Sequence, residues 1–379
     1  MKKRLTILGG AAVAAIAASI LVYAPSASAA VGLHVSGRNI VEANGQTFVM
    51  RGVNHEHVWF TNQTASFANV KALGANTVRV VLSGGRWGTS SVSDVTNVIT
   101  LCKQNRLICV LEDHDTTGYG EDGAAYSLDQ AVNYWISIKS ALVGQENYVA
   151  INIGNEPIGN TNASQWTAAT TAAIQKMRSN GFEHLIMIDA PNWGQDWQYV
   201  MRDNAQTVLD ADTQHNTVLS IHLFSVFNPA ASIPRYLDYF QTKGWPLVIG
   251  EFGWQFDSSQ VDHETLLAEA VARNLGYLGW SWAGNTDPIL DMATNFDPAQ
   301  LTTWGQRIFN GANGIKATAK EASIFGGATS SSAGQPSSSS ASPSSSASPS
   351  RSSAQPSSSS PTSGTRTCSA TYSVTGQWS

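Results

Sequence analysis

Two glutamates in this sequence stand in nearly the same local setting. Glu156 follows Ile153-Gly154-Asn155, and Glu251 follows Val248-Ile249-Gly250, so each comes directly after an apolar run. A glycosidic bond is cleaved through an oxocarbenium-like transition state, which two flanking carboxyl groups can serve. One carboxyl group protonates the leaving oxygen, and the other attacks the anomeric carbon or activates a water. The pair predicts glycoside hydrolysis if the fold brings both residues to one pocket.

Further polar side chains could assist such a pair. The two carboxyl groups need different pKa values, and therefore different surroundings. Arg79 can keep one glutamate ionised through its opposite charge. Asn155 can hydrogen-bond the sugar next to the scissile bond, and His114 and His222 can donate hydrogen bonds to substrate hydroxyls or to a carboxylate. We therefore expect these four side chains to line the site.

Each of these residues has a simpler interpretation. A single glutamate at a strand end is commonly a solvated or salt-bridged surface group. Arg79 could serve only to pair with a carboxylate such as Asp113 or Asp115, and His114 could be a structural histidine. The matched settings of the two glutamates favour the functional interpretation.

Tryptophan is unusually frequent, with 12 residues against 12 Phe and 10 Tyr. Sugars present apolar C–H faces that stack on aromatic rings, and Trp offers the largest such area. Four tryptophans fall in loops or at strand ends and are predicted to bind substrate: Trp59, Trp193, Trp280 and Trp282. Three fall in helical segments and are predicted to be core residues: Trp135, Trp166 and Trp304.

The elements that must position these residues alternate regularly. Eight short apolar runs recur about every 30–40 residues, the size of a βα unit. They are 48–53, 77–82, 107–111, 148–153, 185–188, 218–221, 247–249 and 277–282. Segments with helical periodicity lie between them, among them 91–104, 127–142 and 260–274. Eight such repeats predict an α/β fold, a closed (β/α)8 TIM barrel.

A barrel of this kind carries its chemistry just past the C-terminal ends of the strands. Every predicted strand end has a polar or aromatic residue there: Asn54, His55, His57, Arg79, His114, Asn155, Glu156, Asn192, Trp193, His222, Glu251, Trp280 and Trp282. Stability alone does not explain such a pattern at all eight strand ends. No Gly-x-Gly-x-x-Gly motif opens a helix, so a dinucleotide site has little support.

These residues resemble the retaining endo-β-glycanases of glycoside hydrolase family 5, which are (β/α)8 enzymes. The likeness rests on Asn155-Glu156-Pro157, Glu251-Phe252-Gly253 and the ordered Arg79, His114, His222 and Trp280, and it spans nearly all of 31–325. The resemblance implies that Glu156 is the acid/base and Glu251 the nucleophile, with no cofactor and no metal. The two carboxyl groups should then lie about 5–5.5 Å apart.

Three stretches look like the bacterial β-mannanase branch of that family: Gly32-Leu33-His34-Val35, Met50-Arg51-Gly52-Val53-Asn54-His55 and Ile221-His222-Leu223-Phe224-Ser225-Val226-Phe227. The resemblance implies hydrolysis of internal β-1,4-mannosidic bonds in plant cell-wall mannan, glucomannan or galactomannan. The family usually has a Tyr where this chain has Phe224, so support for the nucleophile must come from elsewhere, for instance Arg79. The alternative is a family 5 β-1,4-glucanase.

Both ends of the chain differ from its middle. Lys2, Lys3 and Arg4 precede an apolar run and the small-residue site Ala27-Ser28-Ala29, which predicts a signal peptide over 1–29 and a secreted protein. A membrane anchor is the alternative. The catalytic domain is then 30–325, and we expect it to act as a monomer.

Residues 326–366 are mostly Ser, Pro, Ala and Gly, which predicts a flexible linker. Residues 367–379 begin with a cysteine and alternate like a first strand. They resemble the start of a family 2 carbohydrate-binding module, a β-sandwich that holds cellulose, and we interpret them as a truncated module.

Charge and cysteine content argue against a nucleic-acid-binding protein and against a disulfide-rich scaffold. The net charge is -5, and none of the 27 acidic residues lies outside 31–325, so a nucleic-acid partner is not expected. Three cysteines do not make a disulfide scaffold. The resemblance leaves Cys368 without its partner, whereas Cys102 and Cys109 are either a disulfide or two buried thiols.

Two rival functions remain. His55-Glu56-His57 is a His-x-His motif, as in metal-dependent amidohydrolase barrels, and His114 and His222 could complete a metal site. Those barrels need an Asp after strand eight, where this chain has Trp280-Ser281-Trp282. The second rival is a non-catalytic polysaccharide-binding barrel, which the presence of both glutamates does not favour.

Overall fold

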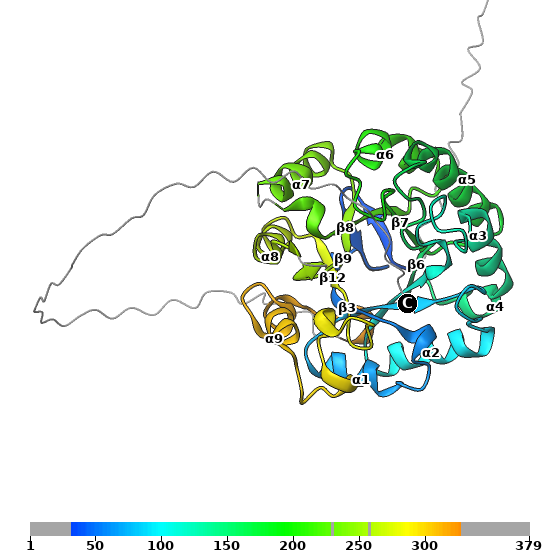
Figure 1. The fold of residues 1–379 in the computed structure, drawn as a ribbon. Helices are drawn as coiled ribbons and strands as arrows, with labels where there is room; N and C mark the ends of the chain where they lie inside the picture. The colour runs from blue at the N-terminus through cyan, green and yellow to red at the C-terminus, as the bar shows by residue number, and fades with distance from the viewer. Residues whose placement is uncertain (1–31, 229–230, 257–258, 327–379) are drawn as a thin grey trace, which may run out of the picture.

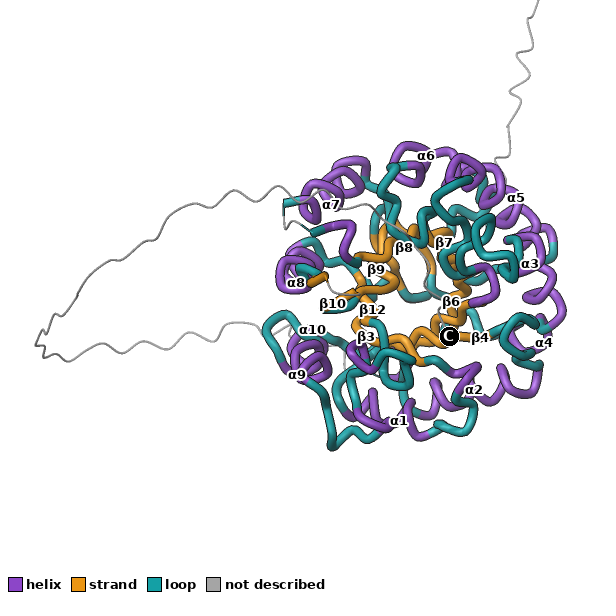
Figure 2. Tube along the Cα trace, viewed as in Figure 1, coloured by secondary structure: helices purple, strands orange, loops and turns teal. Residues whose placement is uncertain are grey.

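The computed structural model describes residues 32–228, 231–256 and 259–326. The predicted signal peptide, all but the first residue of the predicted linker and the fragment 367–379 lie outside the described residues. The described chain forms a closed barrel of eight parallel strands with helices around it (Figure 1, Figure 2), in the order β12-β3-β4-β5-β6-β7-β8-β9. The predicted (β/α)8 fold is confirmed.

The barrel strands match the eight apolar runs closely. They are β3 (Arg51–His55), β4 (Thr77–Leu82), β5 (Ile108–Asp113), β6 (Val149–Asn152), β7 (Leu185–Asp189), β8 (Thr217–Leu223), β9 (Leu247–Phe252) and β12 (Gly276–Gly279). The first strand begins three residues later than predicted, because the Phe48 N–H bonds Ile40 in the hairpin of β1 (His34–Ser36) and β2 (Asn39–Val41). Leu33, Ile40, Phe48 and Met50 pack against inward-facing strand residues.

Helices follow the strands in the expected alternation. They are α1 (Ala65–Ala72), α2 (Val92–Gln104), α3 (Leu128–Ser137), α4 (Lys139–Leu142), α5 (Trp166–Ser179), α6 (Val200–Asp210), α7 (Ser232–Lys243), α8 (His263–Ala272), α9 (Thr303–Asn310) and α10 (Ile315–Thr318). The side chain of Ser91 caps α2, and Ser127 forms a capping box with Gln130 at the start of α3. The predicted segment 127–142 contains two helices, since α3 ends before Ile138. A small hairpin, β10 (Gln255–Phe256) and β11 (Ser259–Gln260), follows β9.

Three tryptophans between the strands and the helices fix the strand ends that carry the site. Trp135 and Trp166 are 0 % exposed and Trp304 is 2 % exposed, so their prediction as core residues is confirmed. Their indole N–H groups donate to the carbonyl oxygens of Ile153, Asp189 and Trp280. Each acceptor lies at or just beyond the C-terminal end of a barrel strand. The core therefore holds the backbone of the site in place as well as burying apolar area.

Cys102 and Cys109 are both buried and both free thiols. Of the two alternatives left by the sequence, the structure has the thiols. Within the described ranges, no helix combines the length and the apolar character that a bilayer span requires.

Candidate active site

Glu156 and Glu251 meet at the C-terminal end of the barrel. Glu156 lies in the loop after β6 with a φ of 39°, and its N–H donates to Asp189 Oδ2 at 3.2 Å. Glu251 lies within β9, where the register with β8 shifts between Ile221 and His222. A carboxylate oxygen of Glu156, one of Glu251 and a ring nitrogen of His222 all lie within 4.8 Å of one another. The predicted pairing of the two glutamates is therefore present.

The separation of the two carboxyl groups is informative about stereochemistry. Inverting glycosidases keep their carboxyl groups about 6.5–9.5 Å apart to admit a water, whereas retaining enzymes keep them about 5–5.5 Å apart. The oxygens of Glu156 and Glu251 approach within 4.8 Å. This spacing fits direct attack on the anomeric carbon and leaves little room for an intervening water.

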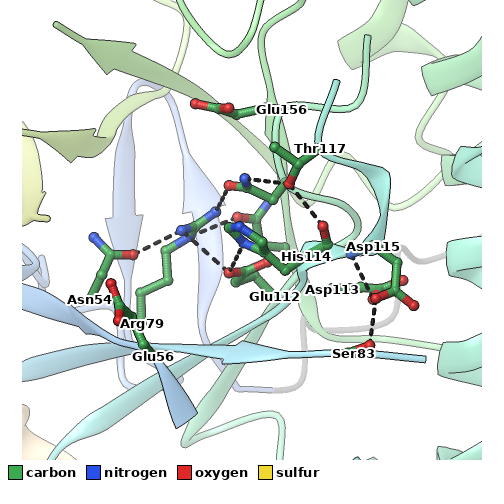
Figure 3. A network of polar contacts seen from close by, with 12 residues as sticks. Asn54, Glu56, Arg79, Ser83, Glu112, Asp113, His114, Asp115, Thr117 and Glu156 are labelled. Atoms are coloured by element: carbon green, nitrogen blue, oxygen red, sulfur yellow. Dashed lines mark hydrogen bonds and ion pairs between the residues drawn. The ribbon is translucent and has the colours of Figure 1, made fainter. Parts of the chain in front are cut away.

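Arg79 bonds Glu251 and organises the polar network of the site, where Figure 3 shows it between Asn54 and Glu112. It projects from β4, and its Nη1 donates to Glu251 Oε1 at 2.6 Å and to Asn54 Oδ1 at 2.8 Å. Its Nη2 donates to Asn155 Oδ1 at 2.7 Å. Its side chain is 0 % exposed, so Arg79 contacts Glu251 and offers no surface to a sugar, contrary to its prediction as a substrate-binding residue. The alternative in which Arg79 only pairs with a carboxylate named the wrong partners, because its carboxylate partners are Glu112, Asp189 and Glu251 and not Asp113 or Asp115.

The buried charges around Arg79 balance one another. Burial by itself lowers the pKa of Arg79, but the carboxylates of Glu112, Glu251 and Asp189 outweigh burial and raise it. Burial by itself raises the pKa of Asp189, but His222 and Arg79 lower it to about 2. Arg79 is thus a fixed positive charge against Glu251.

His222 lies between the two glutamates. Its Nδ1 is 2.8 Å from Glu156 Oε1 and 3.5 Å from Glu251 Oε2, and its Nε2 is 3.3 Å from Asp189 Oδ2. Burial by itself lowers the pKa of His222, but the charges of Glu251 and Asp189 raise it to about 10. The imidazole is therefore protonated at neutral pH and donates a hydrogen bond to Glu156, one of the two roles predicted for it.

The two glutamates have different surroundings, as the chemistry requires. Burial raises the pKa of Glu156, and the hydrogen bond and charge of His222 offset this rise only in part. Glu251 instead forms an ion pair with Arg79 at 2.6 Å. A carboxyl group whose pKa is raised by burial thus lies within 4.8 Å of a carboxylate that is paired with a guanidinium. Fold and site together define the class of retaining glycoside hydrolases built on a (β/α)8 barrel.

Three rings, those of Trp280, His114 and Trp59, form an aromatic wall beside the two glutamates. The ring of His114 stacks on Trp280 with centroids 5.9 Å apart and meets Trp59 edge-on at 5.4 Å. His114 Nδ1 is 3.0 Å from Glu112 Oε1 (Figure 3), and although burial lowers the pKa of His114, Glu112 raises it overall. Trp59 is half-buried and Trp280 is 7 % exposed. The structure brings these predicted residues together at the site.

Other predicted residues fall in different places. Asn155 lies in the site, with Nδ2 donating to Thr117 Oγ1 at 2.9 Å. Trp193 is half-buried in the loop after β7, lies against Gly118 and donates from Nε1 to Glu121 at 2.7 Å. Trp282 is 0 % exposed and belongs to the core. Its prediction as a substrate-binding residue is wrong, because its ring is fully buried and packs edge-on against Phe309 of α9.

Phe224 stands where the family usually has a Tyr. Its ring is 5 % exposed and packs against Phe256, in a cluster that also contains Trp280 and Leu290. A phenyl ring has no hydroxyl that could hydrogen-bond Glu251, and Glu251 instead accepts from Arg79 Nη1 at 2.6 Å.

Sequence reasoning missed four buried polar groups around the site. Glu112, Asn152 and Asp189 all contact Arg79, and each lies within or at the end of a barrel strand. A polar residue inside an otherwise apolar strand was the signal that could have revealed them. Glu56 is the fourth, and the sequence presents it only as the middle residue of the His-x-His motif.

The His-x-His motif does not form a metal site in the described part of the chain. The ring of His55 packs edge-on against Phe67, and burial lowers its pKa to about 3. His57 Nε2 is 2.9 Å from Asp94. Neither residue belongs to the one group there with metal-ligand spacing, which is Glu156, His222 and Glu251. The amidohydrolase interpretation is therefore not supported.

Comparison with known proteins agrees with this class. The family described as Cellulase (glycosyl hydrolase family 5) matches residues 41–286. A mannan endo-1,4-beta-mannosidase of Streptomyces lividans is 53 % identical over 311 residues, which cover 81 % of each chain. One from Cellvibrio japonicus is 47 % identical over 84 % of this chain and 74 % of its own. The crystal structure of a Streptomyces thermolilacinus beta-mannanase with mannohexaose is 58 % identical, with a TM-score of 0.77 over 78 % of this chain and 99 % of its own.

The chain belongs to glycosyl hydrolase family 5.

Proposed function

We propose that this chain is an endo-β-1,4-mannanase, which hydrolyses internal β-1,4-mannosidic bonds of mannan, glucomannan and galactomannan with retention of configuration. The observation that carries the chemistry is the pair Glu156 and Glu251, within 4.8 Å of each other and with different neighbours, a histidine beside Glu156 and a guanidinium against Glu251. The mannan specificity rests on the three relatives described above, which are 53 %, 47 % and 58 % identical to this chain.

The first step forms a glycosyl-enzyme intermediate. A carboxylate oxygen of Glu251 attacks the anomeric carbon, and the bond from that carbon to the leaving oxygen breaks. Glu156, whose pKa is raised by burial, gives its proton to the leaving oxygen. Arg79 holds the attacking carboxylate, at 2.6 Å from Oε1.

The second step releases the sugar. Glu156 is now a carboxylate and takes a proton from a water that attacks the anomeric carbon, while the bond to Glu251 breaks. Protonated His222, 2.8 Å from Glu156 Oε1, stabilises the anionic form of Glu156 during this half of the cycle. Two inversions at one carbon give net retention.

Substrate binding follows from the aromatic wall and one amide. Trp280, with His114 and Trp59 beside it, offers ring surface to the sugar C–H faces. One N–H of Asn155 Nδ2 binds Thr117, and we assign the other to a hydroxyl of the sugar next to the scissile bond. Trp193 extends the aromatic surface beyond β7.

The remaining assignments rest on sequence. We propose that residues 1–29 are a signal peptide and that the protein is secreted, with 30–325 as the catalytic domain and 326–366 as a linker. We propose that 367–379 begin a family 2 carbohydrate-binding module, whose complete form binds cellulose. The catalytic domain acts as a monomer.

Hydrolysis of two polymers tests the substrate. The purified chain is incubated with mannan and with carboxymethylcellulose, and reducing ends and solution viscosity are followed together. We expect reducing ends from mannan with an early fall in viscosity, which is the mark of internal cleavage. Release from carboxymethylcellulose alone would overturn the mannan assignment in favour of a β-1,4-glucanase, and release from neither would favour a binding barrel.

A further inference from the structure

Glu56 is a buried carboxyl group beside the active site that the mechanism above does not use. It follows the last residue of β3 and is 3 % exposed. The hydroxyl of Ser281, which is 0 % exposed, donates to Glu56 Oε1 at 2.9 Å. This bond joins the loop after β3 to the loop after β12, across two neighbouring strands of the barrel.

The hydrogen bonds continue from Ser281 to the ring of Trp280. Asn285 Nδ2 donates to Ser281 Oγ at 2.9 Å, and Asn285 Oδ1 accepts the indole N–H of Trp280 at 2.8 Å. Asp291 Oδ1 accepts from Asn285 Nδ2 at 2.7 Å, which fixes the way the amide faces. Glu56 thus stands at one end of a chain of bonds whose other end is Trp280.

We propose that Glu56 is a positioning residue, which acts through Ser281 and Asn285 to hold the Trp280 indole in the orientation that stacks on the sugar. The inference rests on the proposed function, in which Trp280 is part of the sugar-binding wall. The Trp280 ring packs against His114 and apolar side chains. Such packing keeps the ring buried but does not determine which edge of the indole points toward Asn285. The bond from the indole N–H to Asn285 chooses the edge.

Glu56 carries its proton in this arrangement. Burial raises the pKa of Glu56 to about 8, and the charges of Asp291 and Glu251 add to the rise, whereas the Ser281 hydrogen bond and His114 oppose it. At pH 6–7 the group is therefore a neutral acid, and no further negative charge faces Glu251. A glutamine has nearly the same shape, is also neutral and retains the oxygen that accepts from Ser281.

The experiment compares Glu56→Ala, Ser281→Ala, the double variant and Glu56→Gln at pH 6, with kcat and KM measured separately on soluble mannan. We expect Glu56→Ala and Ser281→Ala each to lower kcat/KM about ten-fold, the order of one disrupted buried hydrogen bond. The double variant should lose no more than either single variant, because both cut the same chain of bonds. Glu56→Gln should stay within about two-fold of the unchanged protein.

The chain offers a matched control. Glu42 is 6 % exposed and also accepts from a serine hydroxyl, that of Ser323, at 2.7 Å, but it directly follows the hairpin strand β2, away from the site. Glu42→Ala should lose stability and keep its kcat/KM. A drop in kcat/KM of the same size in this variant would mean that loss of a buried bond anywhere lowers activity, and would overturn the positioning role.

Stability against pH tests the protonation of Glu56. The folded pKa is raised, so the group costs stability as pH rises from its unfolded pKa of about 4.5 to about 8. The Tm of Glu56→Gln should therefore gain on that of the unchanged protein between pH 5 and pH 8. A constant gap would contradict the protonated state.

Other results would overturn the proposal directly. Glu56→Ala with unchanged kcat/KM, or losses that multiply in the double variant, would show that Glu56 does not act through Ser281. If Glu56→Ala does not fold, Ser281→Ala and Glu56→Gln still decide the matter. If the unchanged chain hydrolyses glucan and not mannan, the proposed substrate fails, while the same variants on glucan still test Glu56.

Discussion

At the scale of residues, the site gives different surroundings to two glutamates whose sequence contexts are alike. Burial and a bond from His222 surround Glu156, whereas the fixed charge of Arg79 lies against Glu251. Three of the groups that create this difference, Arg79, His222 and Asp189, are all fully or almost fully buried and lie on three different strands. The roles of acid and nucleophile thus follow from neighbours and not from the glutamates themselves.

The acid role predicts a dependence on the leaving group. Glu156→Ala should lower kcat on mannan by about 10⁴-fold, because the leaving oxygen must then depart unprotonated. With a dinitrophenyl mannobioside, whose leaving group needs no proton, the burst of released phenol should persist. Glu251→Ala should show no burst with this substrate and no turnover of mannan, because it cannot form the intermediate. A burst from Glu251→Ala and none from Glu156→Ala would reverse the two roles.

The support role of Arg79 predicts a loss in both activity and stability. Arg79→Ala removes the buried guanidinium that pairs with Glu251, Asp189 and Glu112, which should cost about 3–5 kcal/mol of unfolding free energy. Denaturant unfolding and kcat measure the two losses. Lys71→Ala removes a pair with Glu321 whose side chains are 27 % and 25 % exposed, and should cost less than about 1 kcal/mol. Equal losses in the two variants would contradict the account.

At the scale of elements, the hydrophobic runs predicted the barrel, because each strand is buried on both faces and its βα unit repeats. The matched contexts of Glu156 and Glu251 predicted the pair. The burial of Trp282 could not be predicted. The direction of its side chain depends on where β12 ends, and the pairing of β12 with β3 and β9 sets that boundary. The chain of hydrogen bonds from Glu56 to Trp280 could not be predicted either, because its first bond joins Glu56 to Ser281, which lies 225 positions further along the sequence.

The close approach of β3 to β4 gives an element-scale prediction. A Cβ on Gly52 would fall on the carbonyl oxygen of Thr77, which is backbone and cannot rotate away. Gly52→Ala should therefore push the strands apart two residues before Asn54, with a loss of about 1–3 kcal/mol and lower activity. Thermal unfolding and kcat/KM on mannan report the change. Gly123→Ala meets nothing within 4 Å and should behave as the unchanged protein; a loss there as large as at Gly52 would contradict the steric explanation.

At the scale of the whole molecule, the buried charges of the site link stability to pH. The folded pKa of His222 is raised to about 10, so its stabilising effect is complete below its unfolded pKa of about 6.5 and is lost as pH rises toward 10. The Tm should fall by several degrees over that window. His222→Gln should flatten the decline, and calorimetry from pH 6 to pH 10 measures both. An equally steep decline in this variant would contradict a protonated His222.

The acidic residues of the chain all lie in 31–325, and the proposed substrate is a neutral polymer. Binding should then depend on stacking and hydrogen bonds and little on charge, which agrees with a wall made of Trp280, His114 and Trp59. The whole barrel thus serves to bring one aromatic wall and one carboxyl pair to the same end of eight strands.

The central claim is that Glu156 and Glu251 cleave the bond by double displacement. The most direct measurement is proton NMR of a manno-oligosaccharide digest in its first minutes, before the new reducing end equilibrates between anomers. The spacing of the two carboxyl groups within 4.8 Å predicts that the β-anomer appears first and the α-anomer grows in later. Initial release of the α-anomer would show inversion and contradict the account.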